Sequence, residues 1–167
     1  TAVAHGARSI FVVGFDGYAP DAPARERRMQ AEMQEYLQLL KQVANGNRLT
    51  PEDVAWLTTE AVDCWTDALQ QAWHRLEAAA LTKAGEKSGD PWNAVNASGH
   101  WRKAAKPDMA LEITQAALKK VGPDPKPRSG LATTRGGAMR DLGRLDDAKA
   151  LGLDAHNLTP SDFRPCT

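Results

Sequence analysis

The sequence predicts a mainly α-helical fold with one short β-strand near the N-terminus. Over most of the chain, apolar residues recur every three or four positions, which places them along one side of a helix. Only residues 9–15 form a continuous β-branched and aromatic run, the pattern of a strand buried on both faces. Two polar linkers, 84–90 and 122–128, divide the helical part into segments.

The composition is that of an ordinary globular protein. The 167 residues include 42% apolar and 25% charged residues, and Lys plus Arg equals Asp plus Glu at 21 each. This balance argues against a dedicated nucleic-acid or membrane-surface binder, which usually carries a basic excess. No apolar run approaches the roughly 18 residues of a membrane span. Cys64 and Cys166 lie far apart, as expected of unpaired thiols, and we predict a cytoplasmic protein without disulfides.

Residues 21–85 are predicted to form a long-helix hairpin. The first helix spans about 22–44 and ends at Asn45-Gly46-Asn47. The second begins at Thr50, a good N-cap that is followed by Pro51 at the first helical position, and extends over 50–83 unless a break near Val62 divides it. The preceding segment, 1–20, contains the strand and would be a remnant of an α/β domain. The apolar stripe of the first helix consists of Met29, Met33, Tyr36, Leu37, Leu40 and Val43.

The third region, 91–167, contains four predicted short helices, at 91–104, 107–121, 129–142 and 145–158. The linker 122–128 holds three prolines and is expected not to be helical. Shifting the sequence by 38 residues superimposes the two helix pairs. A small residue is followed three positions later by a bulky one, seven later by a turn, and twelve and nineteen later by alanines. These residues are Ser98, Trp101, Ala105, Ala110 and Ala117 in one pair, and Gly136, Met139, Gly143, Ala148 and Ala155 in the other.

This pattern resembles the tetratricopeptide repeat (TPR), with units at about 91–124 and 129–162. Self-similarity at such a period is typical of helical-repeat proteins. Ala105 departs from the family pattern because it replaces the turn glycine, and the four residues beyond the usual 34 fit in the proline-rich linker. Residues 163–167 are similar to the start of a third unit, so we expect the chain to be a fragment of a longer repeat protein.

The resemblance implies a binding surface on the first helix of each unit, which lines the concave face of TPR arrays. Arg102 and Arg140 occupy equivalent positions and would lie in one row, with Lys103 and Arg135 near. Such a row could bind an acidic peptide or a terminal carboxylate through bidentate hydrogen bonds. The alternative is that both arginines pair with Asp141 or Glu112 of this chain. The asparagines of the family's carboxylate clamp have no matching set here.

Two further residues are candidate binding residues. Trp56 lies off the main apolar stripe and would be either an exposed partner anchor or a packing residue. Asp16 follows the predicted strand, where ligands bind in open α/β folds, but Asp16-Gly17 also fits a simple turn.

The sequence contains no metal-ligand spacing, cofactor motif or catalytic constellation. Its four histidines show no metal-ligand arrangement, which predicts surface or helix-end positions for them. The first functional hypothesis is therefore a scaffold whose TPR-like groove binds a protein or an acidic peptide, with no cofactor or metal. Nucleic acid is a weaker candidate partner. The alternative is the C-terminal helical part of a larger α/β enzyme, in which the repeats recruit substrate or hold a homo-oligomer together.

Overall fold

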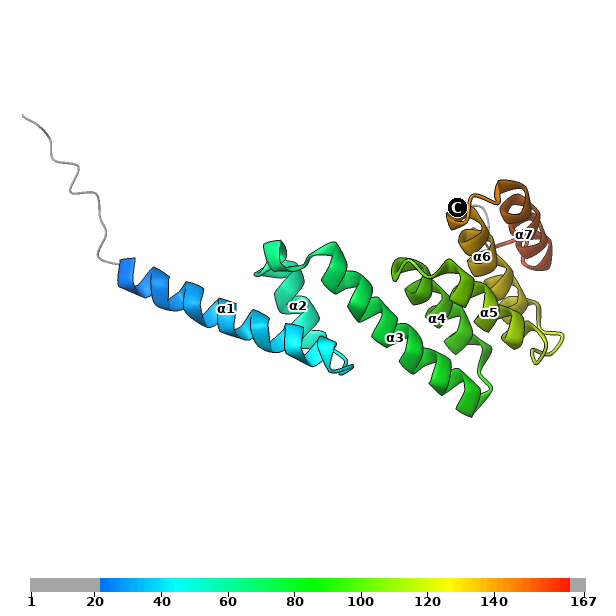
Figure 1. Cartoon of the computed structure of the whole chain (residues 1–167). Coiled ribbons are helices and arrows are strands. Elements are labelled where there is room, and N and C mark those ends of the chain that lie inside the picture. Colours follow the sequence, from blue (N-terminus) through cyan, green and yellow to red (C-terminus); the bar gives the residue numbers. More distant parts are fainter. Residues whose placement is uncertain (1–21, 163–167) are drawn as a thin grey trace, which may run out of the picture. The chain divides into compact units, whose positions relative to one another are not determined.

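The fold is taken from a computed structural model, which describes residues 22–162 (Figure 1). This part is all-α and similar in arrangement to a helical repeat, so the mainly α prediction is confirmed for it. The predicted strand at 9–15 and the candidate Asp16 lie outside the described residues, as do Cys166 and the start of the predicted third unit. None of the helices within 22–162 combines the length and the apolar character needed to cross a membrane.

The chain divides into two compact units, Thr1–Glu35 and Tyr36–Thr167. The described part of the first unit is the beginning of helix α1 (Ala22–Ala44), and all its side chains are exposed. Met29 and Met33 of the predicted apolar stripe are 68% and 55% exposed. Within the second unit, Tyr36, Leu40 and Val43 of the stripe pack against a hydrophobic cluster, whereas Leu37 is 47% exposed.

The second unit begins with a cluster built from the end of α1, α2 (Pro51–Thr59), the 3-10 helix η1 (Val62–Cys64) and the start of α3 (Asp67–Ser88). Four buried leucines form its centre, and Trp56, Trp65 and Trp73 pack against them. Thr50 caps α2 as predicted. Its hydroxyl accepts from the amide of Asp53, whose carboxylate in turn accepts from the amide of Thr50. The leucines are Leu39, Leu49, Leu57 and Leu69.

The segment 50–83 does not form a single helix. It breaks near Val62, which was the alternative expectation. The hydroxyls of Thr58 and Thr59 donate to backbone carbonyls at the end of α2. Thr66 then accepts from the amide of Leu69 at 3.4 Å and caps α3. Threonines that bond to the backbone at a helix end, followed by a new N-cap, favour two helices over one.

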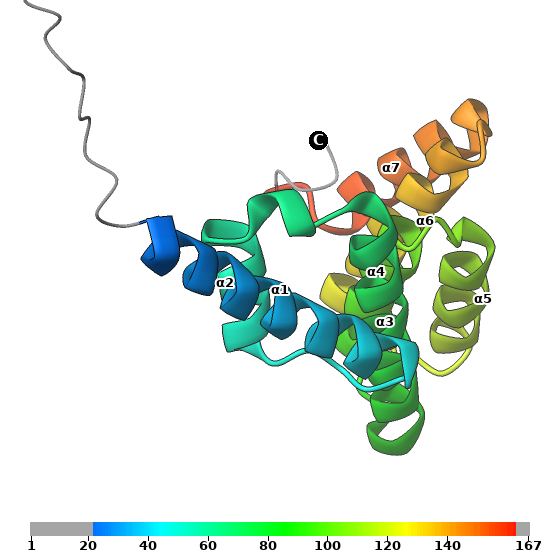
Figure 2. The ribbon, with the colours of Figure 1, turned by 60° about the vertical axis from the view of Figure 1, so that its left-hand side comes forward.

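The helices α4 (Pro91–Lys103), α5 (Pro107–Leu118), α6 (Pro125–Asp141) and α7 (Leu145–Leu158) follow as two antiparallel pairs (Figure 1). Helix α3 packs along α4, and α6 packs against α4, α5 and α7 (Figure 2). Trp101 closes the core between α3 and α4, where its indole N–H donates to the hydroxyl of Thr82 at 3.3 Å. The other buried members of this core are alanines, namely Ala78, Ala97, Ala104, Ala110 and Ala138.

The turns inside the two pairs have equivalent backbone geometry. Ala105 and Gly143 both adopt the left-handed conformation, with φ of 55° and 75°. In the first turn the amide of Lys106 donates to the carbonyl of Trp101, and in the second the amide of Arg144 donates to that of Met139, each at 2.9 Å. Both turns are therefore helix stops of the Schellman type, although only one of them contains glycine.

The small residues of the repeat allow close helix crossings. Ser98 on α4 and Ala110 on α5 are fully buried. On α6, a Cβ atom added to Gly136 would lie 3.2 Å from the carbonyl oxygen of Ala148 on α7, so these two backbones are almost in contact. Alanine and glycine at these positions let the helices pack at the short end of the usual interaxial range.

The expectation for the proline-rich linker is wrong. The linker 122–128 is not free of helix, because α6 begins at Pro125 and includes Pro127. The first amides of a helix have no intrahelical acceptor, so prolines at these positions remove no hydrogen bond. Asp124 supplies the N-cap, and its carboxylate accepts from the amide of Lys126 at 3.0 Å. The linker is thereby reduced to residues 119–124.

Candidate functional site: the face formed by α4 and α6

Charge is segregated between the first and the second helices of the two pairs. Helices α4 and α6 carry six Lys and Arg residues and a single acid, Asp141. Helices α5 and α7 carry five Asp and Glu residues and a single base, Lys149. The basic charge gathers on the two helices that the repeat resemblance assigns to the binding face. The bases on α4 and α6 are Arg102, Lys103, Lys126, Arg128, Arg135 and Arg140.

A cavity of about 520 Å³ opens between α4, α6 and the segment that follows α7. Trp92 and Val95 form its apolar wall on α4, and Lys126 lies at the start of α6. Most of the remaining lining is hydroxyl-bearing. It consists of Ser129, Gly130, Thr133 and Thr134 on α6, and Thr159, Ser161 and Asp162 after α7.

Two glycines on α6 leave space for large side chains of α4 to pack against the α6 backbone. A Cβ atom added to Gly130 would come within 3.0 Å of the Trp92 ring. Seven residues further along the same side of α6, a Cβ atom on Gly137 would overlap the guanidinium group of Arg102. The α4–α6 face thus extends from Trp92 and Gly130, beside the cavity, to Arg102 and Gly137.

Hydroxyl hydrogen bonds fix the floor of the cavity. The Ser129 hydroxyl donates to the carbonyl of Ala155 at 2.9 Å and lies 2.7 Å from the hydroxyl of Thr159. The Thr134 hydroxyl donates to that of Ser98 at 2.8 Å and links α6 to α4. Because these groups bond to one another, the wall on the α6 side is preorganised.

Arg102 and Arg140, the predicted row, both reach Asp141. Arg102 donates through Nε to Asp141 Oδ2 at 2.6 Å and through Nη2 to Oδ1 at 3.2 Å. Arg140 Nε lies 3.7 Å from Asp141 Oδ1. The two arginines therefore share one carboxylate of this chain, the arrangement that the sequence analysis gave as the alternative to partner binding.

The other two predicted basic residues differ in their surroundings. Lys103 is exposed at the end of α4. Arg135 is half-buried and donates from Nη1 to the carbonyl of Leu111 at 3.0 Å and toward the Thr114 hydroxyl at 3.3 Å. Burial lowers the pKa of Arg135. Arg135 therefore connects α6 to α5, while Lys103 faces solvent.

Trp56 and Asp16 are not part of this face. Trp56 is half-buried and packs against the leucine cluster around Leu57, which favours its interpretation as a packing residue. Since Asp16 lies outside 22–162, the strand-end site and the larger-enzyme hypothesis stay predictions.

Sequence reasoning missed a histidine pair between α3 and α4. The Nδ1 atoms of His74 and His100 are 2.9 Å apart, and Trp73 packs against both rings. The surface or helix-end position expected for His74 is wrong, because only 9% of its surface is exposed. A separation of 26 residues leaves no local motif, so only the apolar stripe on α3, which His74 adjoins, could have indicated its burial. No cluster of three potential metal ligands occurs among the residues described.

Burial keeps both histidines neutral. Desolvation, helped by the charges of His100 and Lys103, lowers the pKa of His74 to about 4 against the opposing effect of Glu77. Desolvation also lowers the pKa of His100, with Glu77 opposing and Lys103 and Arg48 reinforcing. Glu77 is itself held by Arg48, whose Nε donates to Oε1 at 2.7 Å. The hydrogen bond between two neutral rings has one Nδ1 as donor and the other as acceptor.

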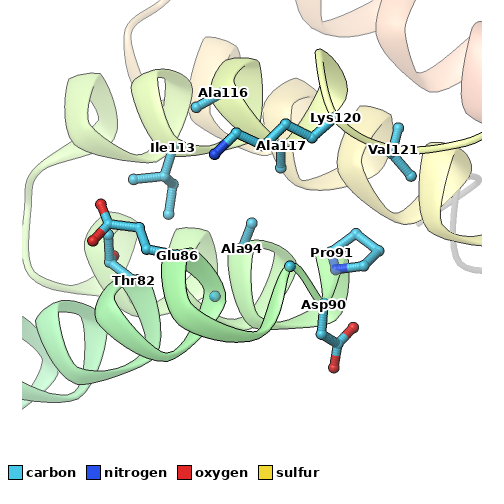
Figure 3. A pocket seen from close by; sticks show the side chains of 12 residues that line it. Thr82, Glu86, Asp90, Pro91, Ala94, Ile113, Ala116, Ala117, Lys120 and Val121 are labelled. Carbon is cyan, nitrogen blue, oxygen red and sulfur yellow. The ribbon is translucent and has the colours of Figure 1, made fainter.

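A second cavity, of about 90 Å³, lies between the end of α3, the start of α4 and the end of α5 (Figure 3). Ala94, Ile113 and Ala117 line its interior, and Glu86 and Lys120 lie at its rim. This volume is small beside the 300–1,000 Å³ typical of ligand pockets. The cavity between α4 and α6 is the larger candidate.

Comparison with known proteins adds no family to this description. Neither a scan against protein-family models nor searches of curated proteins and of solved structures finds a match to the chain.

Proposed function

We propose that residues 91–162 form a TPR-like binding module whose α4–α6 face takes an acidic peptide segment of a protein partner. The observation that carries the proposal is the cavity of about 520 Å³ on the two basic helices. Its volume suits one or two side chains of a partner. A concave, preorganised surface with an aromatic wall is typical of peptide-binding sites.

The chemistry of the lining suggests how a peptide would bind. An apolar side chain would pack against Trp92 and Val95, which form the only apolar wall of the cavity within the described residues. The hydroxyl of Ser161 could bond to a peptide carbonyl or amide, because a hydroxyl both donates and accepts. The hydroxyl of Thr133 donates to the carbonyl of Ser129 at 2.9 Å and could accept from a peptide amide. Acidic residues on either side of the anchor would be attracted to Lys126 and Arg140.

Fluorescence anisotropy with labelled peptides tests the proposal. We would screen peptide pools that share an apolar anchor and differ only in the sign of their charged residues, and we expect binding to the acidic pool. Trp92→Ala should weaken binding at least tenfold by removing the aromatic wall. Val62→Ala, which removes an apolar side chain that is 58% exposed outside the face, is the matched control.

A charge-reversal pair tests the electrostatic part. Lys126→Glu should weaken binding of the acidic pool, whereas Lys149→Glu, on the acidic helix α7, should have much less effect. Equal binding of acidic and basic pools, or equal loss with both variants, would refute the proposal. Displacement of the peptide by a short oligonucleotide, but not by unlabelled acidic peptide, would instead assign the face to nucleic acid.

A further inference from the structure

The cluster of Arg102, Arg140 and Asp141 has the composition of an occupied carboxylate-binding site. One carboxylate accepts two hydrogen bonds from the Arg102 fork, and a second guanidinium lies 3.7 Å from the same carboxylate. Bidentate arginine–carboxylate contacts of this kind are the usual means of recognising a terminal or side-chain carboxylate. Here the carboxylate belongs to the chain itself.

The position of Asp141 makes it an electrostatically poor occupant. It is the last residue of α6, at the negative end of the helix dipole. A carboxylate there is repelled by the helix, and its attraction to Arg102 has to offset that repulsion. A carboxylate of a bound peptide could meet the same arginines without lying at the helix end.

The cluster is also accessible. The side chains of Arg102, Asp141 and Arg140 are 23%, 30% and 61% exposed, so an external anion can reach the guanidinium groups without unfolding a helix. Arg102 crosses α6 at Gly137, where any larger side chain would displace the guanidinium group. The arginine fork is thus held in place by packing as well as by Asp141.

We propose that Asp141 is an internal occupant of a carboxylate-binding site, and that a carboxylate of the partner displaces it from Arg102 and Arg140. This inference rests on the proposed function for the identity of the partner, but the site itself can be tested without any peptide. The competing explanation is that Arg102 and Asp141 form a tie between α4 and α6 with no binding role. The two explanations differ in how peptide binding responds when the charge of Asp141 is removed, because only an internal competitor weakens binding.

Rescue of Asp141→Ala by a small carboxylate shows whether the arginines accept an external anion, which the inference requires. Replacing chloride by formate or acetate at constant ionic strength should raise the melting temperature of this variant by about 2–4 °C, because the anion binds the native state between the arginines. The wild type and Glu112→Ala, which removes an exposed carboxylate on α5, should show no such rise. Asp141→Ala combined with Arg102→Gln should lose the rescue.

Asp141→Ser is the second variant if Asp141→Ala fails to fold, because its short side chain still leaves the position of the carboxylate open to an anion. Selective stabilisation of either variant by formate supports the inference. If formate does not selectively stabilise a folded variant at any anion concentration at which the protein stays soluble, the inference is overturned. The Arg102–Asp141 pair is then a structural tie between α4 and α6.

The peptide assay then separates this inference from the proposed function. If both hold, Asp141→Asn should bind the acidic peptide pool roughly tenfold more tightly than the wild type, since the internal competitor is neutralised. Formate rescue without any peptide binding would support the carboxylate site and count against the proposed function. Peptide binding that is weakened by Asp141→Asn would overturn the displacement step.

Discussion

At the scale of single residues, Ala105 occupies a backbone conformation that favours glycine. It occupies the left-handed turn between α4 and α5 with φ of 55°, while its counterpart in the next pair is Gly143. A side chain in this conformation costs about 1 kcal/mol relative to glycine. The turn hydrogen bonds are the same at both places, so the strain is borne by Ala105 itself.

Ala105→Gly should therefore stabilise the protein by roughly 0.5–1 kcal/mol, because relief of the strained conformation outweighs the greater freedom of glycine in the unfolded chain. The reciprocal variant Gly143→Ala should destabilise by roughly 1 kcal/mol. Urea denaturation followed by circular dichroism measures both. A loss of stability with Ala105→Gly would show that the methyl group makes contacts that matter more than the strain.

The His74–His100 pair makes stability depend on pH. The pKa of His74 is about 4 in the folded protein and near 6.5 in the unfolded chain, so the unfolded chain binds more protons between these values. The contribution of the neutral pair is fully present above pH 6.5 and is lost as the pH falls toward 4, by roughly 2–3 kcal/mol for a shift of this size. When both rings are protonated, both Nδ1 atoms carry hydrogens and the hydrogen bond is lost.

We expect the melting temperature of the wild type to fall more steeply between pH 6.5 and 4.5 than that of His74→Asn. Asparagine places a polar atom near the position of Nδ1 and does not titrate. His156→Asn, which removes a histidine from α7, is the control and should retain the wild-type slope. Identical slopes for the wild type and His74→Asn would exclude the pair as the source of the acid sensitivity.

At the scale of elements, the sequence was most informative where its local signals were strong. Thr50-Pro51 marked the start of α2, and the 38-residue shift located both helix pairs with their turns. The start of α6 differs from the sequence prediction because prolines, which bar the interior of a helix, are tolerated in its first turn. The Trp92–Gly130 and His74–His100 contacts escaped prediction for another reason: they join different helices, and no local spacing encodes which side chain lies opposite which.

The contribution of the Asp124 N-cap to the start of α6 can be measured by substitution. Asp124→Ala removes the acceptor for the amide of Lys126 and the negative charge at the positive helix end, so it should cost about 1 kcal/mol. Asp124→Asn keeps the cap and should cost less. Because the first turn of α6 carries Lys126 at the cavity, Asp124→Ala should also weaken peptide binding if the proposed function holds. Equal stability of the Ala and Asn variants would indicate that the turn is held by packing alone.

At the scale of the whole second unit, α3 connects two hydrophobic clusters. Its first turn contributes Leu69 to the leucine cluster, and further along it contributes Ala78 to the alanine-rich core that includes Trp101. Helices gain most of their stability from the packing of their faces, and a helix that spans two clusters couples their unfolding. The His74–His100 contact lies between these two positions and adds to the coupling.

This arrangement predicts one cooperative transition for residues 36–162. Leu57→Ala, in the first cluster, and Leu131→Ala, on α6, each remove a fully buried side chain and should each cost about 2–5 kcal/mol. Because α3 belongs to both clusters and α6 contributes Ala138 to the second, both variants should shift the same single urea transition. Tryptophan fluorescence and circular dichroism should then report coincident curves. An early transition in Leu57→Ala that leaves the α4–α7 signal at its wild-type midpoint would show that the repeat pairs fold independently of the leucine cluster. In that case α3 would act as an end cap of the repeat pairs, and the α4–α6 face could be studied without the residues before α3.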